Sequence, residues 1–226
     1  MPARGPFAVD QAPQAVLFDL DGTLIDSAPS LARAVDVMLG QLQRPAAGEA
    51  RVRDWVGNGA RVLVHRALTE GSEADVDPAL LERAHGLFLQ AYGEAPEAGT
   101  LVYPGVRRFL DALRRRGLPL GLITNKPAAF IPPLLKSFEL EVFFALTLGG
   151  DSLAEKKPHP APLLHAARHF GVAPGRCLMV GDSRHDIEAA RRAGCPVAAV
   201  SYGYNHGEPV GDAAPDWVVD SLPELL

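Results

Sequence analysis

The sequence lacks the features that mark disulfide-rich, membrane-spanning and strongly basic proteins. It contains only two cysteines, Cys177 and Cys195, which are too few for a disulfide framework and are expected to be packing thiols. No apolar run approaches membrane-spanning length, and residues 1–13 lack the features of a signal peptide, so we expect them to form a loose tail. Positive charge is not in excess, because 22 basic residues face 27 acidic ones. The net charge of −5 argues against nucleic-acid or membrane partners, and we expect a cytoplasmic monomer or homodimer.

Short apolar runs alternate with helical segments along most of the chain. Apolar residues make up 47% of the sequence, which is enough for a sizeable core. The runs read as buried strands over residues 15–18, 118–123, 144–148, 177–180, 197–200 and 217–219. This alternation predicts an α/β fold, a doubly wound parallel sheet with helices on both faces.

Residues 25–100 interrupt the alternation with helices alone. Apolar residues fall on one helical face over 29–42, the helical style continues over 51–68, and Asp77-Pro78 begins another helix. We therefore expect two domains: a core of residues 1–24 and 101–226, and a helical insert of residues 25–100.

Polar residues follow three of the expected strands directly. Asp19 and Asp21 come after the first strand, Thr124 after the second and Asp182 after the fourth. In a doubly wound sheet, ligands bind beyond the carboxyl ends of the strands. These side chains are therefore expected to meet at one edge of the sheet, although more than a hundred residues separate them.

The paired carboxylates suit phosphoryl transfer. One carboxylate can attack phosphorus, and a second can protonate the leaving oxygen and then deprotonate the attacking water. With Asp182 and Asp186 nearby, Asp19 and Asp21 would repel one another, and a hard cation such as Mg²⁺ would offset that repulsion. The seven histidines show no zinc-ligand spacing and are expected to be structural or solvated.

The charge of a phosphate also needs donors. Thr124 supplies a hydroxyl, Lys157 a positive charge, and Gly22 and Asn125 supply backbone N–H groups. Taken alone, Thr124 would more simply cap a helix and Lys157 would be a surface lysine. Their shared position after strands favours the functional interpretation.

These segments, in this order, resemble the four motifs of the haloacid dehalogenase superfamily. The motifs are Asp19-Leu20-Asp21-Gly22-Thr23, Thr124-Asn125, Lys157, and Gly181-Asp182-Ser183-Arg184-His185-Asp186. The resemblance implies that Asp19 is the nucleophile, that Asp21 is the general acid and base, and that the helical insert is a type 1 cap.

The same resemblance implies the metal ligands. Mg²⁺ would be held by Asp19, the carbonyl group of Asp21 and Asp182. Asp186 would support the site by holding Lys157 and a metal-bound water. The presence of Asp21 favours a phosphatase or phosphomutase over a dehalogenase.

Within the superfamily the chain resembles the phosphoglycolate phosphatases from Val16 onward. The stretches that carry this resemblance include Trp55-Val56-Gly57-Asn58-Gly59-Ala60, Tyr103-Pro104-Gly105-Val106 and Tyr202-Gly203-Tyr204-Asn205. The resemblance implies hydrolysis of 2-phosphoglycolate, a small anionic phosphate ester. Its carboxylate could be bound by backbone N–H groups of the Gly57-Asn58-Gly59 segment or by Arg66. A plain turn between helices and a solvated helix face are the simpler interpretations of those two features.

Several alternatives remain open at this stage. Another small phosphate could be the substrate, namely a sugar phosphate, N-acetylmuramic acid 6-phosphate or pyrophosphate. A phosphomutase similar to β-phosphoglucomutase is a further option. A non-catalytic binding protein would be expected to lack one of the motif residues, and none is absent.

Overall fold

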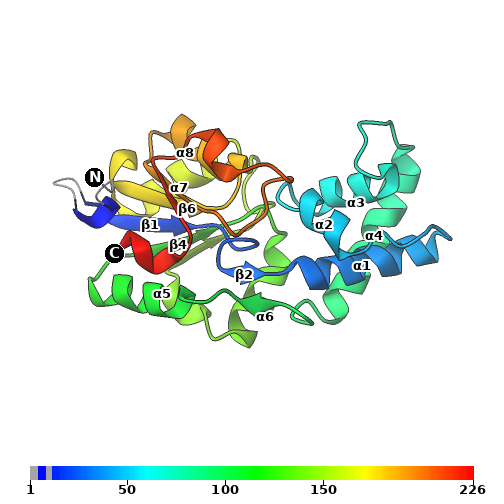
Figure 1. Ribbon diagram of the computed structural model, residues 1–226, viewed down its shortest axis with the longest axis horizontal. Helices are drawn as coiled ribbons and strands as arrows, with labels where there is room; N and C mark the ends of the chain where they lie inside the picture. Colours follow the sequence, from blue (N-terminus) through cyan, green and yellow to red (C-terminus); the bar gives the residue numbers. More distant parts are fainter. Residues whose placement is uncertain (1–4, 9–11) are drawn as a thin grey trace.

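The computed structural model describes residues 5–8 and 12–226 and contains a six-stranded parallel sheet (Figure 1). The strand order is β5-β4-β1-β6-β7-β8. The strands are β1 (Ala15–Phe18), β4 (Leu120–Ile123), β5 (Leu146–Leu148), β6 (Cys177–Gly181), β7 (Val197–Val200) and β8 (Trp217–Val219). The expected α/β class with a parallel sheet is confirmed, and each expected strand is present with shifts of a few residues at some ends.

Side chains along each strand point alternately to opposite faces of the sheet, so each face carries its own set of apolar side chains. Helices pack against both faces. Val16 and Phe18 of β1 belong to a cluster with the helices α5 (Val106–Arg115) and α6 (Ile131–Ser137). Ala15 and Leu17 belong to a second cluster. The helices of that second cluster are α7 (Ala161–Phe170) and α8 (Arg184–Ala193).

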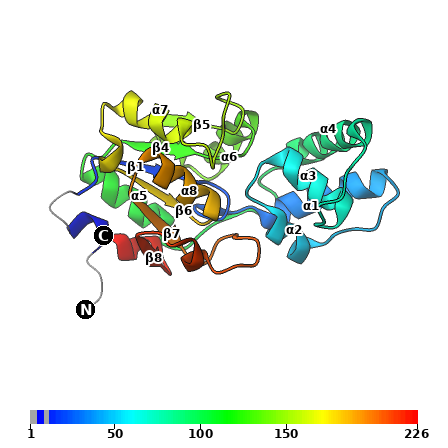
Figure 2. The ribbon, with the colours of Figure 1, turned by 90° about the horizontal axis from the view of Figure 1, so that it is seen from above.

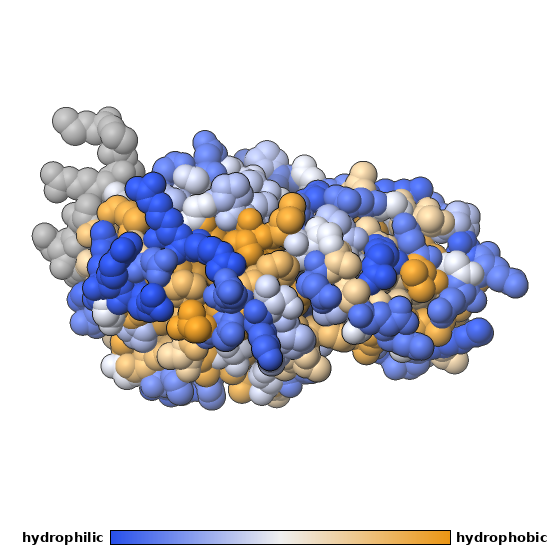
Figure 3. Space-filling view, turned by 90° about the horizontal axis from the view of Figure 1, so that it is seen from below, coloured by the Kyte–Doolittle hydropathy of each residue, from blue (hydrophilic) through white to orange (hydrophobic). Residues whose placement is uncertain are grey.

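Four helices form a separate lobe beside the sheet (Figure 2). They are α1 (Ala28–Gln41), α2 (Glu49–Trp55), α3 (Ala60–Thr69) and α4 (Pro78–Glu94). Their buried side chains make a third cluster, to which the described core contributes Tyr204. The chain enters and leaves this lobe through two short antiparallel strands, β2 (Ile25–Asp26) and β3 (Leu101–Val102). The molecule narrows between the lobes, and its surface there mixes hydrophobic and hydrophilic residues (Figure 3).

The helical segment expected over 51–68 consists of two helices joined by a turn, one of the two interpretations offered for Gly57-Asn58-Gly59. Helix α2 ends at Trp55 and α3 begins at Ala60. Gly57 and Gly59 between them have φ of 123° and 90°, a left-handed backbone that other residues rarely adopt. The intervening turn carries the Asn58 segment toward the core.

The expectation of a loose tail over 1–13 is wrong for the part of it that the structure describes. Residues 1–4 and 9–11 lie outside the described residues. Pro6–Ala8 forms a short 3-10 helix, and the Phe7 ring lies 6.5 Å from that of Phe109 in an edge-on contact. This apolar contact holds the segment against the core.

Both cysteines are free and buried, as expected for packing thiols. Among the described residues, no helix combines the length and apolar character needed to cross a membrane.

Candidate active site

The site lies at the carboxyl ends of the central strands. Asp19 follows β1, Thr124 follows β4 and Asp182 follows β6. Strand β1 pairs with β4 on one side and with β6 on the other, so these three residues come from neighbouring strands. The strand order reverses at β1, which is the position where doubly wound sheets bind ligands.

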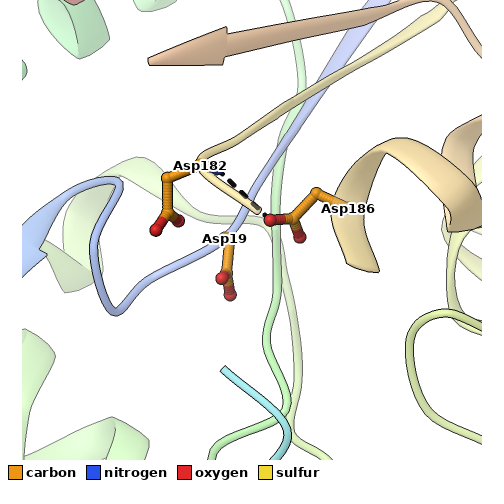
Figure 4. Close-up of side chains that lie close together, drawn as sticks. All are labelled: Asp19, Asp182 and Asp186. Atoms are coloured by element: carbon orange, nitrogen blue, oxygen red, sulfur yellow. Dashed lines mark hydrogen bonds between the residues drawn. The ribbon is translucent and has the colours of Figure 1, made fainter. Parts of the chain in front are cut away.

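Three carboxylates meet there. Oxygen atoms of Asp19, Asp182 and Asp186 all lie within 4.8 Å of one another (Figure 4). Burial raises the pKa of Asp19 to about 6; Lys157 opposes this shift and Asp186 reinforces it. Burial, reinforced by Asp186 and Asp19, raises the pKa of Asp182 well above its ordinary value. The cluster is therefore a concentration of negative charge that the fold alone does not compensate.

Lys157 is the cation of this cluster. Its Nζ lies 2.9 Å from Asp19 Oδ1 and 2.6 Å from Asp186 Oδ1. Burial lowers its pKa, but the two carboxylates outweigh that effect and raise it. The ammonium group therefore remains charged while it is buried.

The start of α8 positions Asp186. Asp186 Oδ2 accepts hydrogen bonds from the backbone N–H groups of Asp182 and Ser183 and from the Ser183 hydroxyl. These bonds satisfy donors at the helix N-terminus. One oxygen of Asp186 thus caps the helix while the other holds Lys157.

Asp182 is fixed by two donors from elsewhere in the chain. Thr23 Oγ1 donates to Asp182 Oδ1 at 2.7 Å, and the Tyr204 N–H donates to Oδ2 at 2.6 Å. Gly22 makes this approach possible: its φ is 89°, and a Cβ there would lie 2.2 Å from Asp182 Oδ2. A side chain at position 22 would therefore displace the carboxylate.

Asp21 has a partner that the sequence did not indicate. Lys126 Nζ lies 2.9 and 3.0 Å from the two carboxylate oxygens of Asp21, and the Ser27 hydroxyl donates to Oδ1 at 2.6 Å. Lys126 is only 5% exposed. Its single signal in the sequence was its place directly after the Thr124-Asn125 motif.

Thr124 and Asn125 join the site as expected, but the Asn125 side chain is used differently. Both residues line the cavity between the lobes, together with Asp19 and Asp21. The Asn125 amide group donates to the carbonyl oxygens of Gly57 and Lys157, at 3.0 and 2.9 Å. It therefore ties the helical lobe to the Lys157 loop.

The residues expected to bind substrate from the helical lobe have other partners. Asn58 Nδ2 lies 2.6 Å from His185 Nε2, and Lys156 Nζ donates to the Asn58 carbonyl oxygen at 2.9 Å. Arg66 donates to the Trp55 carbonyl oxygen and to Asn58 Oδ1, at 2.7 and 3.2 Å.

Of these expected contacts, only the two glycines line the cavity. Gly57 and Gly59 line it, whereas Asn58 and Arg66 are not among its lining residues. Asn58 and Arg66 thus brace the turn between α2 and α3, and any role of theirs in substrate binding stays a prediction.

The acid cluster fits a divalent cation. Lys157 contacts Asp19 and Asp186, but its single positive charge compensates only part of the charge of the three carboxylates. A buried carboxylate whose charge is not compensated is costly unless a further cation reaches it. Hard divalent ions prefer such oxygen ligands.

Comparison with known proteins agrees with this geometry. The family model of haloacid dehalogenase-like hydrolases matches residues 13–194. The chain is 54% identical to the phosphoglycolate phosphatase of Pseudomonas putida, over 95% of this chain and 79% of that protein. It is 47% identical to the phosphoglycolate phosphatase of Escherichia coli K12, over 93% of this chain and 90% of that one.

A solved structure has the same fold. The crystal structure of a predicted phosphoglycolate phosphatase from Haemophilus somnus superposes with a TM-score of 0.90 at 38% identity. The match covers 96% of this chain and 98% of the other. The expected enzyme class, a phosphoric monoester hydrolase, is confirmed, and the chain belongs to the haloacid dehalogenase-like hydrolase family.

Proposed function

We propose that this enzyme is a Mg²⁺-dependent phosphatase that hydrolyses 2-phosphoglycolate to glycolate and phosphate. The observation that carries the proposal is the position of Asp19, at the switch point of the sheet, facing the cavity and paired with Lys157. The relatives named phosphoglycolate phosphatase support the choice of substrate.

The reaction proceeds through a phosphoryl group on Asp19. A carboxylate oxygen of Asp19 attacks phosphorus, the bond from phosphorus to the ester oxygen breaks, and an aspartyl-phosphate forms. Asp21 gives a proton to the departing glycolate oxygen. Asp21 then takes a proton from the attacking water, and hydrolysis releases phosphate and restores the Asp19 carboxylate.

Donors around Asp19 hold the phosphoryl oxygens. Lys157 supplies a charge that Asp186 keeps in place, and the Thr124 hydroxyl and the N–H groups of Gly22 and Asn125 supply neutral donors. Asp19, Asp182 and the Asp21 carbonyl would hold the Mg²⁺. When bound, the ion offsets the charge on the transferring group.

The helical lobe, residues 25–100, acts as a cap over residues 1–24 and 101–226 in this proposal. The cavity is lined from both lobes, with Asp19 and Thr124 on one side and Val56, Phe88 and Tyr92 on the other. Such a cap excludes water and strengthens the electrostatic contacts within. We also propose the cytoplasm as the location, since free buried cysteines suit a reducing compartment.

A substrate panel tests the proposal. The panel is 2-phosphoglycolate, a sugar phosphate, N-acetylmuramic acid 6-phosphate and pyrophosphate, each assayed for free phosphate with Mg²⁺ and with a chelator. We expect kcat/KM for 2-phosphoglycolate to exceed the others and activity to vanish with the chelator. Near-equal values would remove the glycolate assignment, and an isomerised product without free phosphate would indicate a mutase.

A further inference from the structure

Lys126 is a buried cation that the chemistry above does not use. Its side chain is 3% exposed, and its Nζ contacts both oxygens of Asp21. The same Nζ lies 4.8 Å from the centre of the Tyr92 ring. Burying an ammonium group is costly, and the Asp21 carboxylate and Tyr92 outweigh that cost, which raises the pKa of Lys126 and keeps the group charged.

A second donor stands beside this cation. The Tyr92 hydroxyl is buried and interacts with Lys126 and Ser30. Tyr92 and Lys126 both line the cavity that holds Asp19 and Asp21. Lys126 keeps its positive charge while it contacts Asp21 and Tyr92, and the Tyr92 hydroxyl has a proton of its own to donate. Together the two side chains therefore present a positive charge and an O–H donor to an anion in the cavity.

The other cations near the cavity are occupied elsewhere. Lys157 is paired with Asp19 and Asp186, and Arg66 is bonded to the turn between α2 and α3. Lys156 donates to the Asn58 carbonyl oxygen. Within the described part of the chain, Lys126 is the one cationic side chain that lines the cavity.

The position of Lys126 matches one end of the substrate. Asp21, which it contacts, protonates the leaving oxygen in the proposed reaction, so Lys126 lies on the leaving-group side of phosphorus. In a phosphorylated 2-hydroxy acid the carboxylate is one carbon away from that leaving oxygen. Apolar side chains of Leu31 and Phe88 line the same cavity, and this low-dielectric wall strengthens an ion pair within it.

We propose that Lys126, assisted by the Tyr92 hydroxyl, binds the carboxylate of the substrate and thereby selects short phosphorylated 2-hydroxy acids. This inference rests on the proposed phosphatase function and adds a specificity residue to it. It assigns carboxylate recognition to Lys126 of the core and Tyr92 of α4, in place of Arg66 or the Asn58 turn.

The test compares two substrates that differ in the carboxylate. Purified wild-type protein, Lys126→Met, Tyr92→Phe and the control Lys156→Met are assayed with Mg²⁺ on 2-phosphoglycolate and on ethyl phosphate. In Lys126→Met the ratio of kcat/KM for 2-phosphoglycolate to kcat/KM for ethyl phosphate should fall roughly a hundredfold. The reason is that only 2-phosphoglycolate loses a buried charge-assisted contact. Tyr92→Phe should lower the ratio roughly tenfold.

Lys156→Met alters a lysine that contacts the cap but not the cavity, so it should change both substrates alike and keep the ratio. A wild-type ratio in Lys126→Met, or in Tyr92→Phe if the lysine variant does not fold, would overturn the inference. Wild-type protein that does not prefer 2-phosphoglycolate over ethyl phosphate would instead overturn the proposed function.

Discussion

At the scale of single residues, the site is organised by uncompensated charge. Three buried carboxylates share one ammonium group, and burial raises the pKa of both Asp19 and Asp182. A carboxyl group whose pKa is higher in the folded state than in the unfolded state costs folding free energy once it is ionised. The residues that perform the chemistry therefore weaken the metal-free fold at neutral pH.

Asp19→Asn separates the role of Asp19 in catalysis from the cost of its buried charge to the stability of the fold. The amide cannot attack phosphorus, so kcat for 2-phosphoglycolate should fall by at least about a thousandfold. The amide is also uncharged, so the melting temperature of the metal-free variant at neutral pH should equal or exceed that of the wild type. Steady-state kinetics measures the expected fall in kcat, and thermal unfolding measures the expected melting temperature. Near-normal turnover would show that another group is the nucleophile, and a parallel loss of stability would point to a structural role.

Asp182→Asn tests the cation. A ligand present at a hundredfold excess over its Kd stabilises a protein by about 2.7 kcal/mol. Mg²⁺ should therefore raise the wild-type melting temperature by roughly 5 to 10 °C. The variant should lose most of this rise, because Asp182 contributes one of the three clustered carboxylates.

Glu188→Gln is the matched control for Asp182→Asn. Glu188 is an acid on α8 whose side chain is 45% exposed and pairs with Arg192. In this control Mg²⁺ should raise the melting temperature as much as in the wild type, since an exposed ion pair contributes little to stability. A full rise in Asp182→Asn as well would place the cation elsewhere.

The sequence indicated the acidic residues of the site but not their partners. Asp19, Asp182 and Lys157 were predictable because short motifs after strands carry them to one edge of the sheet. Lys126, Tyr92 and Tyr204 were not, because their roles depend on contacts between segments far apart in the chain. Tyr204 donates its N–H to Asp182, which lies 22 residues away, and its hydroxyl contacts the start of α1.

At the scale of elements, the apolar runs predicted the strands of the parallel sheet and missed the two-residue strands that lead into and out of the helical lobe. Strand β7 (Val197–Val200) and strand β8 (Trp217–Val219) occur where the apolar runs placed them. The two-residue strands β2 and β3 have no detectable pattern, because their pairing brings together residues more than 70 positions apart. The break between α2 and α3 is set by Gly57 and Gly59, where the sequence had offered a plain turn between helices.

That break brings Asn58 against the core, and Asn58→Ala tests its role. The substitution removes the contacts to His185 and Arg66, and kcat/KM should fall roughly five- to tenfold as the turn is less firmly held. Because the contact is between the lobes, the loss should be equal for 2-phosphoglycolate and ethyl phosphate.

A double-mutant cycle with His185→Ala sharpens this test. If the two side chains act through their contact, the double variant should be hardly worse than either single one. Additive losses would mean that each acts separately, and a changed substrate ratio in Asn58→Ala would restore Asn58 as a substrate contact.

At the scale of the whole molecule, two hydrophobic cores are joined by a narrow connection. The helical lobe has its own buried cluster, and the sheet has one on each face. Two chain crossings, β2 and β3, link the lobes, and polar contacts of the Asn58 turn and apolar contacts of Tyr204 and Phe130 with the helical lobe add to them. Interfaces between domains of one chain are commonly small, and relative motion of the domains is then the default expectation.

Weak coupling predicts that the lobes unfold separately, which matched leucine substitutions can detect. Leu39→Ala removes a side chain that is 2% exposed in the helical lobe, and Leu178→Ala removes a fully buried one in β6. Each should cost about 2 to 5 kcal/mol. In calorimetry, Leu39→Ala should lower a first transition by at least about 8 °C and leave a second one in place.

Activity assigns the transitions to the lobes. Between the two transitions of Leu39→Ala, hydrolysis of 2-phosphoglycolate should be lost, because the cavity needs side chains from both lobes. An aryl phosphate, whose leaving group needs less assistance, should still be hydrolysed by the intact sheet and its acid cluster. Leu178→Ala should lower the upper transition and abolish both activities together. A single transition shifted equally by both substitutions would mean that the chain folds as one unit, and the boundary proposed at residues 25 and 100 would then have no energetic meaning.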